Sequence, residues 1–138
     1  MSPRLMVVDD EEKVRKYLSR LVKNRGFQVE TAADGATALT MIKENDFDVV
    51  LLDVLMPGMD GIAVLKEIKK LKPLTEVIML TGNASVETGI EGMRLGAFDY
   101  LLKPVDLENL YLCLKEAMEQ KKIRESSGDP FQKQKGSQ

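Results

Sequence analysis

Five short apolar runs restrict the fold of this chain more than any other feature. They are Leu5–Val8, Val29–Ala32, Val49–Leu52, Val77–Leu80 and Tyr100–Leu102, the last with Phe98 just before it. Each is rich in Leu or β-branched residues and nearly continuous, without the alternation that marks a strand with one wet face. Such runs are typical of strands buried on both faces of a parallel sheet that helices cover. The first and third runs are the clearest and the second is the weakest.

The segments between these runs have helical periodicity. Their apolar stripes are Val14, Leu18, Leu21, Val22; Ala38, Leu39, Ile42; Ile62, Leu65, Ile68, Leu71; Val86, Ile90, Met93; and Leu107, Leu110, Leu114, Ala117. Most of these positions are expected to pack in the core. Strand and helix alternate five times, which predicts an α/β fold: a doubly wound, five-stranded parallel sheet with right-handed crossovers.

The fourth helical segment differs from the others because it contains two interior glycines, Gly89 and Gly92. Each glycine costs a helix about 0.5–1 kcal/mol relative to alanine. We therefore expect this helix to be marginal and mobile, with less amide-exchange protection than the first or fifth helix.

Length and composition exclude several classes of protein. A chain of 138 residues is expected to form one domain. It has no histidine, so a histidine-based triad or histidine-ligated zinc site cannot form within it. It has one cysteine, Cys113, which we expect to be a packing residue in a reducing compartment. No apolar run approaches the roughly 20 residues needed to span a bilayer, and no signal segment opens the chain, so we expect a cytoplasmic protein without membrane contact.

Charge divides the chain into an acidic body and a basic end. Residues 1–120 hold 15 basic and 20 acidic side chains, whereas residues 121–138 hold five basic and two acidic ones. An acidic body is poorly suited to nucleic acid, because phosphate binding needs clustered Lys and Arg. We expect a folded domain at residues 1–122 and, at 123–138, a polar basic tail or the start of a linker.

Polar residues collect where the predicted strands end. Asp9 and Asp10 follow the first run, Asp53 the third, Thr81 the fourth and Lys103 the fifth. The carboxyl ends of parallel strands share one edge, which is where such sheets bind ligands. Clustered carboxylates repel each other unless a cation neutralises them. With oxygen ligands and no histidine, that cation is expected to be Mg²⁺ or Mn²⁺.

A carboxylate, a metal site, a hydroxyl and a lysine around one point are typical of phosphoryl transfer. Asp53 is the best acceptor, because it stands alone after the third run, whereas Asp9 and Asp10 are adjacent and suit metal binding. Taken singly, each residue also has a structural explanation. The aspartates could cap helices, Thr81 could cap the fourth helix, and Lys103 could be solvated. The complete set favours the phosphoryl-transfer interpretation.

Four motifs in order resemble the receiver domain of two-component response regulators. They are VVDDEE (7–12), LLDVLMPGMDG (51–61), MLTGNAS (79–85) and GAFDYLLKP (96–104). The resemblance covers residues 4 to about 122 and implies flavodoxin-like receiver architecture with strand order 2-1-3-4-5. The last two motifs are similar to those of receivers in transcriptional regulators with an AAA+ domain, a weaker sub-family indication.

The resemblance assigns roles around the acidic residues. It implies that Asp53 is the phosphoacceptor and also a metal ligand. Asp10 would bind Mg²⁺ directly and Asp9 through water, while the main-chain carbonyl of Leu55 would be a further ligand. Leu55 and Asn83 occupy the two variable positions beside the site, and we expect Leu55 to slow loss of the phosphate by shielding it from water.

The resemblance also implies a switch and a set of partners. Thr81 and Lys103 would hold the phosphoryl oxygens, Tyr100 would turn inward when Thr81 moves, and the Lys103–Pro104 peptide bond would be cis. The donor would be the phosphohistidine of a sensor histidine kinase or phosphotransfer protein. The output face would comprise the fourth helix, fifth strand and fifth helix, which would control an output domain or partner and could support a homodimer.

Three alternatives remain at this point. A haloacid-dehalogenase-type phosphatase places a second aspartate two residues after its nucleophile, where this chain has Leu55. A flavodoxin-like FMN carrier needs a phosphate-cradling loop after the first strand, whereas Asp9, Asp10, Glu11 and Glu12 would repel phosphate. An interaction domain with a silent site would not need the full residue set. We therefore expect a signalling phosphoacceptor that catalyses only its own phosphorylation and slow dephosphorylation.

Overall fold

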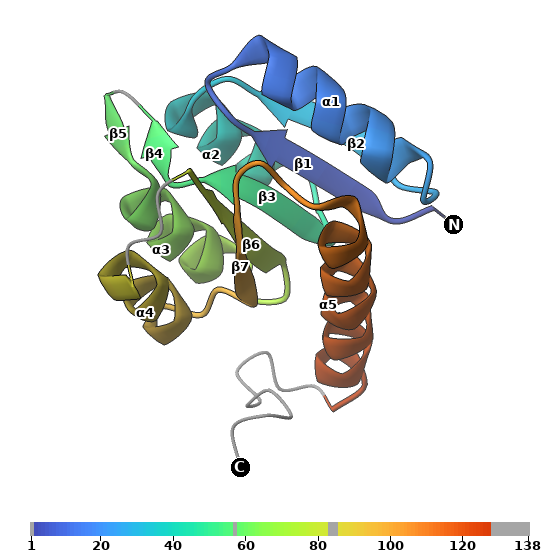
Figure 1. Ribbon diagram of the computed structural model, residues 1–138. Helices are drawn as coiled ribbons and strands as arrows, with labels where there is room; N and C mark the ends of the chain where they lie inside the picture. The colour runs from blue at the N-terminus through green and yellow to red at the C-terminus, as the bar shows by residue number, and fades with distance from the viewer. Residues whose placement is uncertain (1, 57, 83–85, 128–138) are drawn as a thin grey trace.

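The computed structural model describes residues 2–56, 58–82 and 86–127, and its five long strands alternate with five helices as predicted (Figure 1). The five long strands are β1 (Arg4–Val8), β2 (Gln28–Ala32), β3 (Val49–Asp53), β6 (Glu76–Thr81) and β7 (Asp99–Leu102). The helices are α1 (Glu12–Lys23), α2 (Gly35–Glu44), α3 (Gly61–Leu71), α4 (Val86–Arg94) and α5 (Leu107–Ser127).

The five long strands form one sheet in the order β2-β1-β3-β6-β7, and every pair in it is parallel. Counted as the five predicted strands, this order is 2-1-3-4-5, so the predicted fold class and strand order are confirmed. The strands β4 (Leu55–Met56) and β5 (Met59–Asp60) form a separate antiparallel pair that the sequence did not predict. These two-residue strands are too short to produce a recognisable pattern.

Helices cover both faces of the sheet (Figure 1). On one face, Leu18 of α1 and Leu110 of α5 pack with the side chains of Leu5 and Val7 in β1. On the other face, Ile42 of α2 and Leu65 of α3 pack with the alternate β1 side chains, such as Met6. Because successive side chains of a strand point to opposite faces, each central strand contributes to both cores. This arrangement accounts for the continuous apolar runs in the sequence.

Burial separates the central strands from the edge strands. All five residues of β3 and all six of β6 are buried, and β1 is buried after its first residue. In β2, at one edge, only Ala32 is buried, and β7, at the other edge, contains no buried residue. The weakness of the second apolar run therefore reflects its edge position.

The two glycines of α4 lie where the helix packs closely. A Cβ atom added at Gly92 would lie 2.2 Å from the Met79 sulfur of β6, and one at Gly89 would lie 3.2 Å from Cε1 of Tyr100. Both glycines therefore have a packing role, which the sequence did not reveal, in addition to their cost in helix propensity.

Helix α5 passes through the expected domain boundary at residue 122 and continues to Ser127. Arg124, in the expected tail, is buried. Residues 128–138 of that tail lie outside the described part of the chain. Among the helices of the described residues, none combines the length and apolar character needed to cross a membrane.

Candidate functional site

The predicted aspartates, Thr81 and Lys103 lie at the carboxyl edge of the sheet, at the ends of four of its strands or just after them. Neighbouring strand ends are joined there by backbone hydrogen bonds. Asp9 N–H donates to the carbonyl of Ala32, and Lys103 N–H donates to that of Thr81 at 2.8 Å. Asp53 is the last residue of β3, the central strand, and Thr81 is the last residue of β6. The sheet therefore brings residues far apart in sequence to one place.

Three carboxyl groups meet at this edge. One carboxylate oxygen from each of Asp9, Asp10 and Asp53 lies within 4.8 Å of the other two. Asp9 and Asp53 are buried, whereas Asp10 is exposed. The acidic cluster thus has a buried floor and one solvent-facing carboxylate, a set of oxygen donors that suits a hard divalent cation.

Lys103 provides the positive charge next to these carboxylates. Its Nζ lies 2.6 Å from Oδ2 of Asp9 and 3.4 Å from Oδ2 of Asp53. Burial alone would lower the pKa of Lys103, but the hydrogen bond to Asp9 and the charges of Asp53 and Asp9 outweigh it and raise the pKa. Lys103 is therefore held in its charged form.

Opposing interactions act on the pKa of the Asp53 carboxyl group. Burial raises the pKa of its carboxyl group, and the charge of Asp9 adds to this effect. The Leu55 N–H, which donates to Asp53 Oδ1 at 3.0 Å, and the ammonium group of Lys103 act in the other direction, but the net shift is upward. The carboxylate of Asp53 is consequently less favourable here than in water, and a second cation would stabilise it.

Two contacts in the loop after β1 were not predicted from the sequence. Arg15 Nη1 donates to the carbonyl oxygen of Asp9 at 2.7 Å, and Glu11 N–H donates to Asp9 Oδ1 at 2.9 Å. Together with Lys103, these donors fix both the backbone and the side chain of Asp9. The i to i+6 spacing of Asp9 and Arg15 is the only signal in the sequence, and it is too common to be informative.

The remaining predicted residues differ in position. Thr81 is buried, and the Lys103–Pro104 peptide bond is cis. Leu55 is 60% exposed beside the acidic cluster, whereas Tyr100 is 41% exposed on β7, next to Gly89 of α4. Asn83 lies outside the described residues.

The fold and the site define a class of protein: a doubly wound domain of the flavodoxin-like type with an acidic cluster and a lysine at the carboxyl edge of the sheet. Residues 5–115 match the response regulator receiver domain family. The chain belongs to this family, as the four motifs indicated, and receiver domains are signalling domains of two-component systems.

Relatives and solved structures agree with this assignment. The chain is 45% identical over 116 residues to the regulatory protein AtoC of Escherichia coli, covering 84% of this chain and 25% of that protein. A response regulator receiver domain protein (CheY-like) from Methanospirillum hungatei superposes with a TM-score of 0.86 at 30% identity, covering 90% of this chain and 99% of the other. NtrX from Brucella abortus gives a TM-score of 0.86 at 33% identity, covering 93% and 29% of the two chains.

The chain spans about a quarter of the length of the curated relatives it matches. These relatives include the transcriptional regulatory protein ZraR of Escherichia coli, 45% identical over 114 residues, which agrees with the expected sub-family of transcriptional regulators.

Proposed function

We propose that this receiver domain accepts a phosphoryl group on Asp53 from the phosphohistidine of a sensor histidine kinase or phosphotransfer protein. One observation carries the proposal. The Asp53 carboxylate is buried at the end of the central strand, 3.4 Å from the ammonium group of Lys103, and clusters with Asp9 and Asp10. These 138 residues contain no histidine, so the donor histidine lies outside this segment.

The acidic cluster is proposed to hold Mg²⁺, with Mn²⁺ as an alternative. Asp9, Asp10 and Asp53 supply carboxylate oxygens, and the main-chain carbonyl of Leu55 is the further protein ligand that the family resemblance implies. This all-oxygen donor set matches the preference of both cations. When bound, the metal would neutralise negative charge on the phosphoryl group during its transfer.

The side chains of the site then have distinct roles in the transfer. A carboxylate oxygen of Asp53 attacks phosphorus, an O–P bond forms, and the P–N bond to the donor imidazole breaks. The imidazole nitrogen leaves with the bonding electron pair and remains on the partner. The Thr81 hydroxyl and the Lys103 ammonium group hold the phosphoryl oxygens, where they stabilise the charge that develops.

The output is proposed to arise from α4, β7 and α5. Phosphorylation adds about −1.5 to −2 charges at Asp53, so Thr81 and Lys103 gain a new partner. When Thr81 moves towards the phosphoryl group, the segment after β6 must move with it. Tyr100 lies on β7 beside α4 and is the aromatic residue that turns inward. Exposed apolar side chains lie on these three elements: Ile90, Met93, Tyr100, Leu102, Leu107, Leu112 and Ile123.

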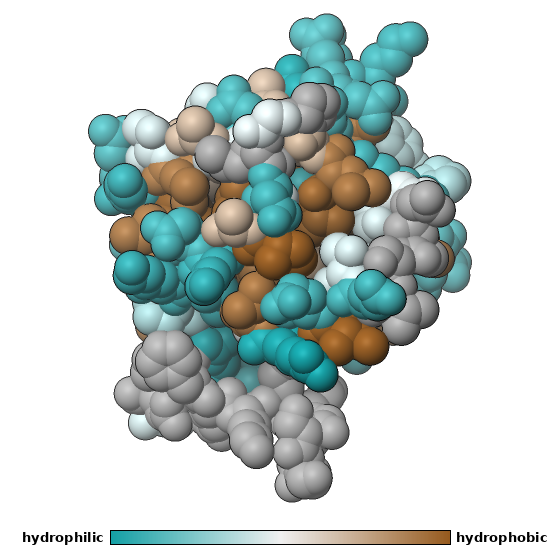
Figure 2. All heavy atoms as spheres, turned by 90° about the vertical axis from the view of Figure 1, so that its left-hand side faces the viewer, coloured by the Kyte–Doolittle hydropathy of each residue, from teal (hydrophilic) through white to brown (hydrophobic). Residues whose placement is uncertain are grey.

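This apolar surface suits a homodimer contact or a C-terminal output domain of a longer chain. Figure 2 views the side of the molecule that carries β4, β5 and α4 and shows apolar patches among polar side chains there.

We do not propose direct nucleic-acid binding by this acidic domain. A cytoplasmic location is proposed, because the kinase and its phosphohistidine act there.

The lifetime of the phosphate is proposed to depend on Leu55 and Asn83. The Leu55 side chain is 60% exposed beside Asp53, so it can cover the acyl phosphate and keep water away. Apart from this slow self-hydrolysis, we assign the domain no enzymatic turnover. In Leu55→Asn the phosphate should be lost faster, and an unchanged rate would remove the shielding explanation.

Labelling with acetyl phosphate tests the function. Wild-type protein with Mg²⁺ should gain one phosphoryl group by intact mass. Asp53→Asn should gain none, and Asp46→Asn, at the opposite edge of the sheet, should behave like wild type. Beryllium fluoride with Mg²⁺ should shift NMR signals of residues 82–104. Labelling of Asp53→Asn to the wild-type level, or no shift in this segment, would contradict the proposal.

A further inference from the structure

The last turns of α5 are attached to the end of the sheet opposite the acidic cluster. Arg124 of α5 is only 5% exposed, and its Nη1 lies 2.8 Å from Oε2 of Glu76, the fully buried first residue of β6. Its Nη2 donates to the carbonyl oxygen of Pro73 at 2.7 Å, in the loop after α3. One guanidinium group therefore joins three elements.

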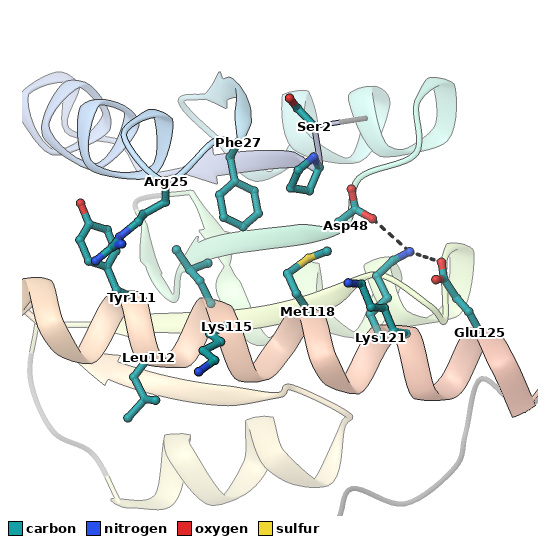
Figure 3. Close-up of a pocket in the computed structure, with 13 residues that line it drawn as sticks. Ser2, Arg25, Phe27, Asp48, Tyr111, Leu112, Lys115, Met118, Lys121 and Glu125 are labelled. Atoms are coloured by element: carbon teal, nitrogen blue, oxygen red, sulfur yellow. Dashed lines mark hydrogen bonds and ion pairs between the residues drawn. The ribbon is translucent and has the colours of Figure 1, made fainter.

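A second contact lies about one turn earlier in α5. Lys121 Nζ is 3.1 Å from Oδ1 of Asp48 and also pairs with Glu125, as Figure 3 shows. Oδ2 of Asp48 accepts the backbone N–H of Arg4 at 2.8 Å. The end of α5 is thus connected to the amino ends of β1, β3 and β6. We call Arg124, Glu76, Lys121 and Asp48 the basal clasp.

Apolar packing does not explain this attachment. The buried apolar residues of α5 are Leu110, Cys113, Leu114 and Ala117. Met118 packs half-buried against the same core, and beyond it the helix buries only the polar residues Gln120 and Arg124. Beside the clasp lies a hollow of about 770 Å³ between α5 and the amino ends of the strands, lined by Phe27 and Met118 among others (Figure 3). Polar contacts therefore hold the part of the helix beyond Met118.

The buried ion pair of Arg124 and Glu76 differs from an apolar contact in its effect on orientation. Burying two charges costs desolvation energy, and an apolar pair of similar size often gives equal or greater stability. A guanidinium group, however, has donors in fixed directions, and its contacts with Glu76 and Pro73 define an orientation that apolar contacts do not.

We propose that the basal clasp is a positioning device that holds residues 118–127 against the sheet and fixes the direction in which the chain leaves the domain at Ser127. The two α5 residues of the clasp, Lys121 and Arg124, lie beyond residue 115, where the match to the family ends. In a receiver joined to a further domain, it would set the geometry of the junction. The proposal does not depend on phosphorylation of Asp53.

The first test is amide hydrogen exchange of the complete chain carrying Arg124→Met. Exchange at residues 118–127 should accelerate at least about tenfold, while residues 107–116 should change little. Lys122→Met is the matched control, because Lys122 is an exposed lysine of the same helix turn, and it should leave both segments unchanged. Equal protection of residues 118–127 in Arg124→Met and wild type would overturn the proposal.

The direction of the end of α5 is tested separately, because a loss of helix stability alone would also accelerate amide exchange. Spin labels are placed at Ser127→Cys and at exposed Lys23→Cys in a Cys113→Ala background, and their distance distribution is measured. Arg124→Met should broaden this distribution and Lys122→Met should not.

If Arg124→Met unfolds the domain, the double variant Arg124→Met with Glu76→Met removes the unpaired buried carboxylate. It should fold and still give the broad distribution. A distribution as narrow as that of the parent labelled protein, in either Arg124 variant, would show that the clasp does not orient the helix end.

Discussion

The ammonium group of Lys103 lies 2.6 Å from the carboxylate of Asp9, a residue 94 positions earlier in the chain, and is closer to it than to Asp53. Without a phosphoryl group, the main ionic contact of Lys103 is therefore with Asp9. Phosphorylation of Asp53 would offer the lysine a stronger partner nearby. The position of Lys103 between two carboxylates suits it both to balance the acidic cluster and to bind the phosphoryl group.

Replacement of Lys103 tests this second role. In Lys103→Met, acetyl-phosphate labelling should be slower by about 10²–10³-fold, because a donor to the developing charge is lost. The rate is measured by intact mass over time at saturating Mg²⁺. Lys115→Met, an exposed lysine of α5, is the control and should label at the wild-type rate. A wild-type rate in Lys103→Met would remove the lysine from the transfer step.

Asp53→Asn should stabilise the metal-free protein at neutral pH. Burial raises the pKa of Asp53 in the folded state, so ionised Asp53 opposes folding when the pH is above that pKa. The gain in free energy of unfolding at pH 7 should shrink as the pH falls through the folded pKa towards the ordinary value of 3.8. Urea unfolding in EDTA between pH 4 and pH 7.5 measures it. A gain that grows on acidification would contradict the sign.

Mg²⁺ should stabilise the wild-type protein, because the folded acidic cluster binds it and the unfolded chain does not. At ten times its dissociation constant the gain is about 1.4 kcal/mol, seen as a higher Tm. Asp10→Asn should lose most of this gain. Asp46→Asn removes an aspartate at the other end of the sheet and should keep the gain in full. Equal responses of the two variants would place the metal elsewhere.

Gly89→Ala should strengthen α4 and disturb Tyr100. Alanine favours the helix by about 0.5–1 kcal/mol, but its Cβ would lie 3.2 Å from the Tyr100 ring, which is half-exposed and can move. Amide exchange in α4 should slow several-fold, and the Tyr100 ring signals should shift. Glu91→Ala, at an exposed position of the same helix, replaces one strong helix former by another, so it should leave both the exchange and the Tyr100 signals nearly unchanged. Unchanged ring signals in Gly89→Ala would contradict the contact.

The Cys113 thiol should react slowly in the folded protein. Burial raises its pKa to about 12, and the nearby charges of Asp99 and Glu116 contribute to the rise. At pH 8 the thiolate fraction is then roughly a thousandth of that of an ordinary cysteine. Alkylation followed by mass spectrometry should be slow in buffer and fast in denaturing urea, and similar rates in both would rule out a protected thiol.

Much of the fold could be predicted because local patterns carry it. Continuous apolar runs identified β1, β3 and β6, and their position inside a covered sheet is the physical reason for those runs. The short strands β4 and β5 were not predicted, because two-residue strands have no periodicity. Helix α5 continues to Ser127, past the domain boundary expected at residue 122. Its last turns were hard to predict, since Arg124 reads as a solvated charge until Glu76 is placed against it.

The sequence by itself determined the chemistry of the site: which residues end the strands, the absence of histidine, and the family. Only the tertiary structure decided which partners these residues have. The contact of Lys103 with Asp9 and that of Arg124 with Glu76 join residues 94 and 48 positions apart. Such contacts depend on how strands and helices pack, and a side chain's burial and pKa follow from that packing. Neither the burial nor the pKa of a side chain can be inferred from a local sequence pattern.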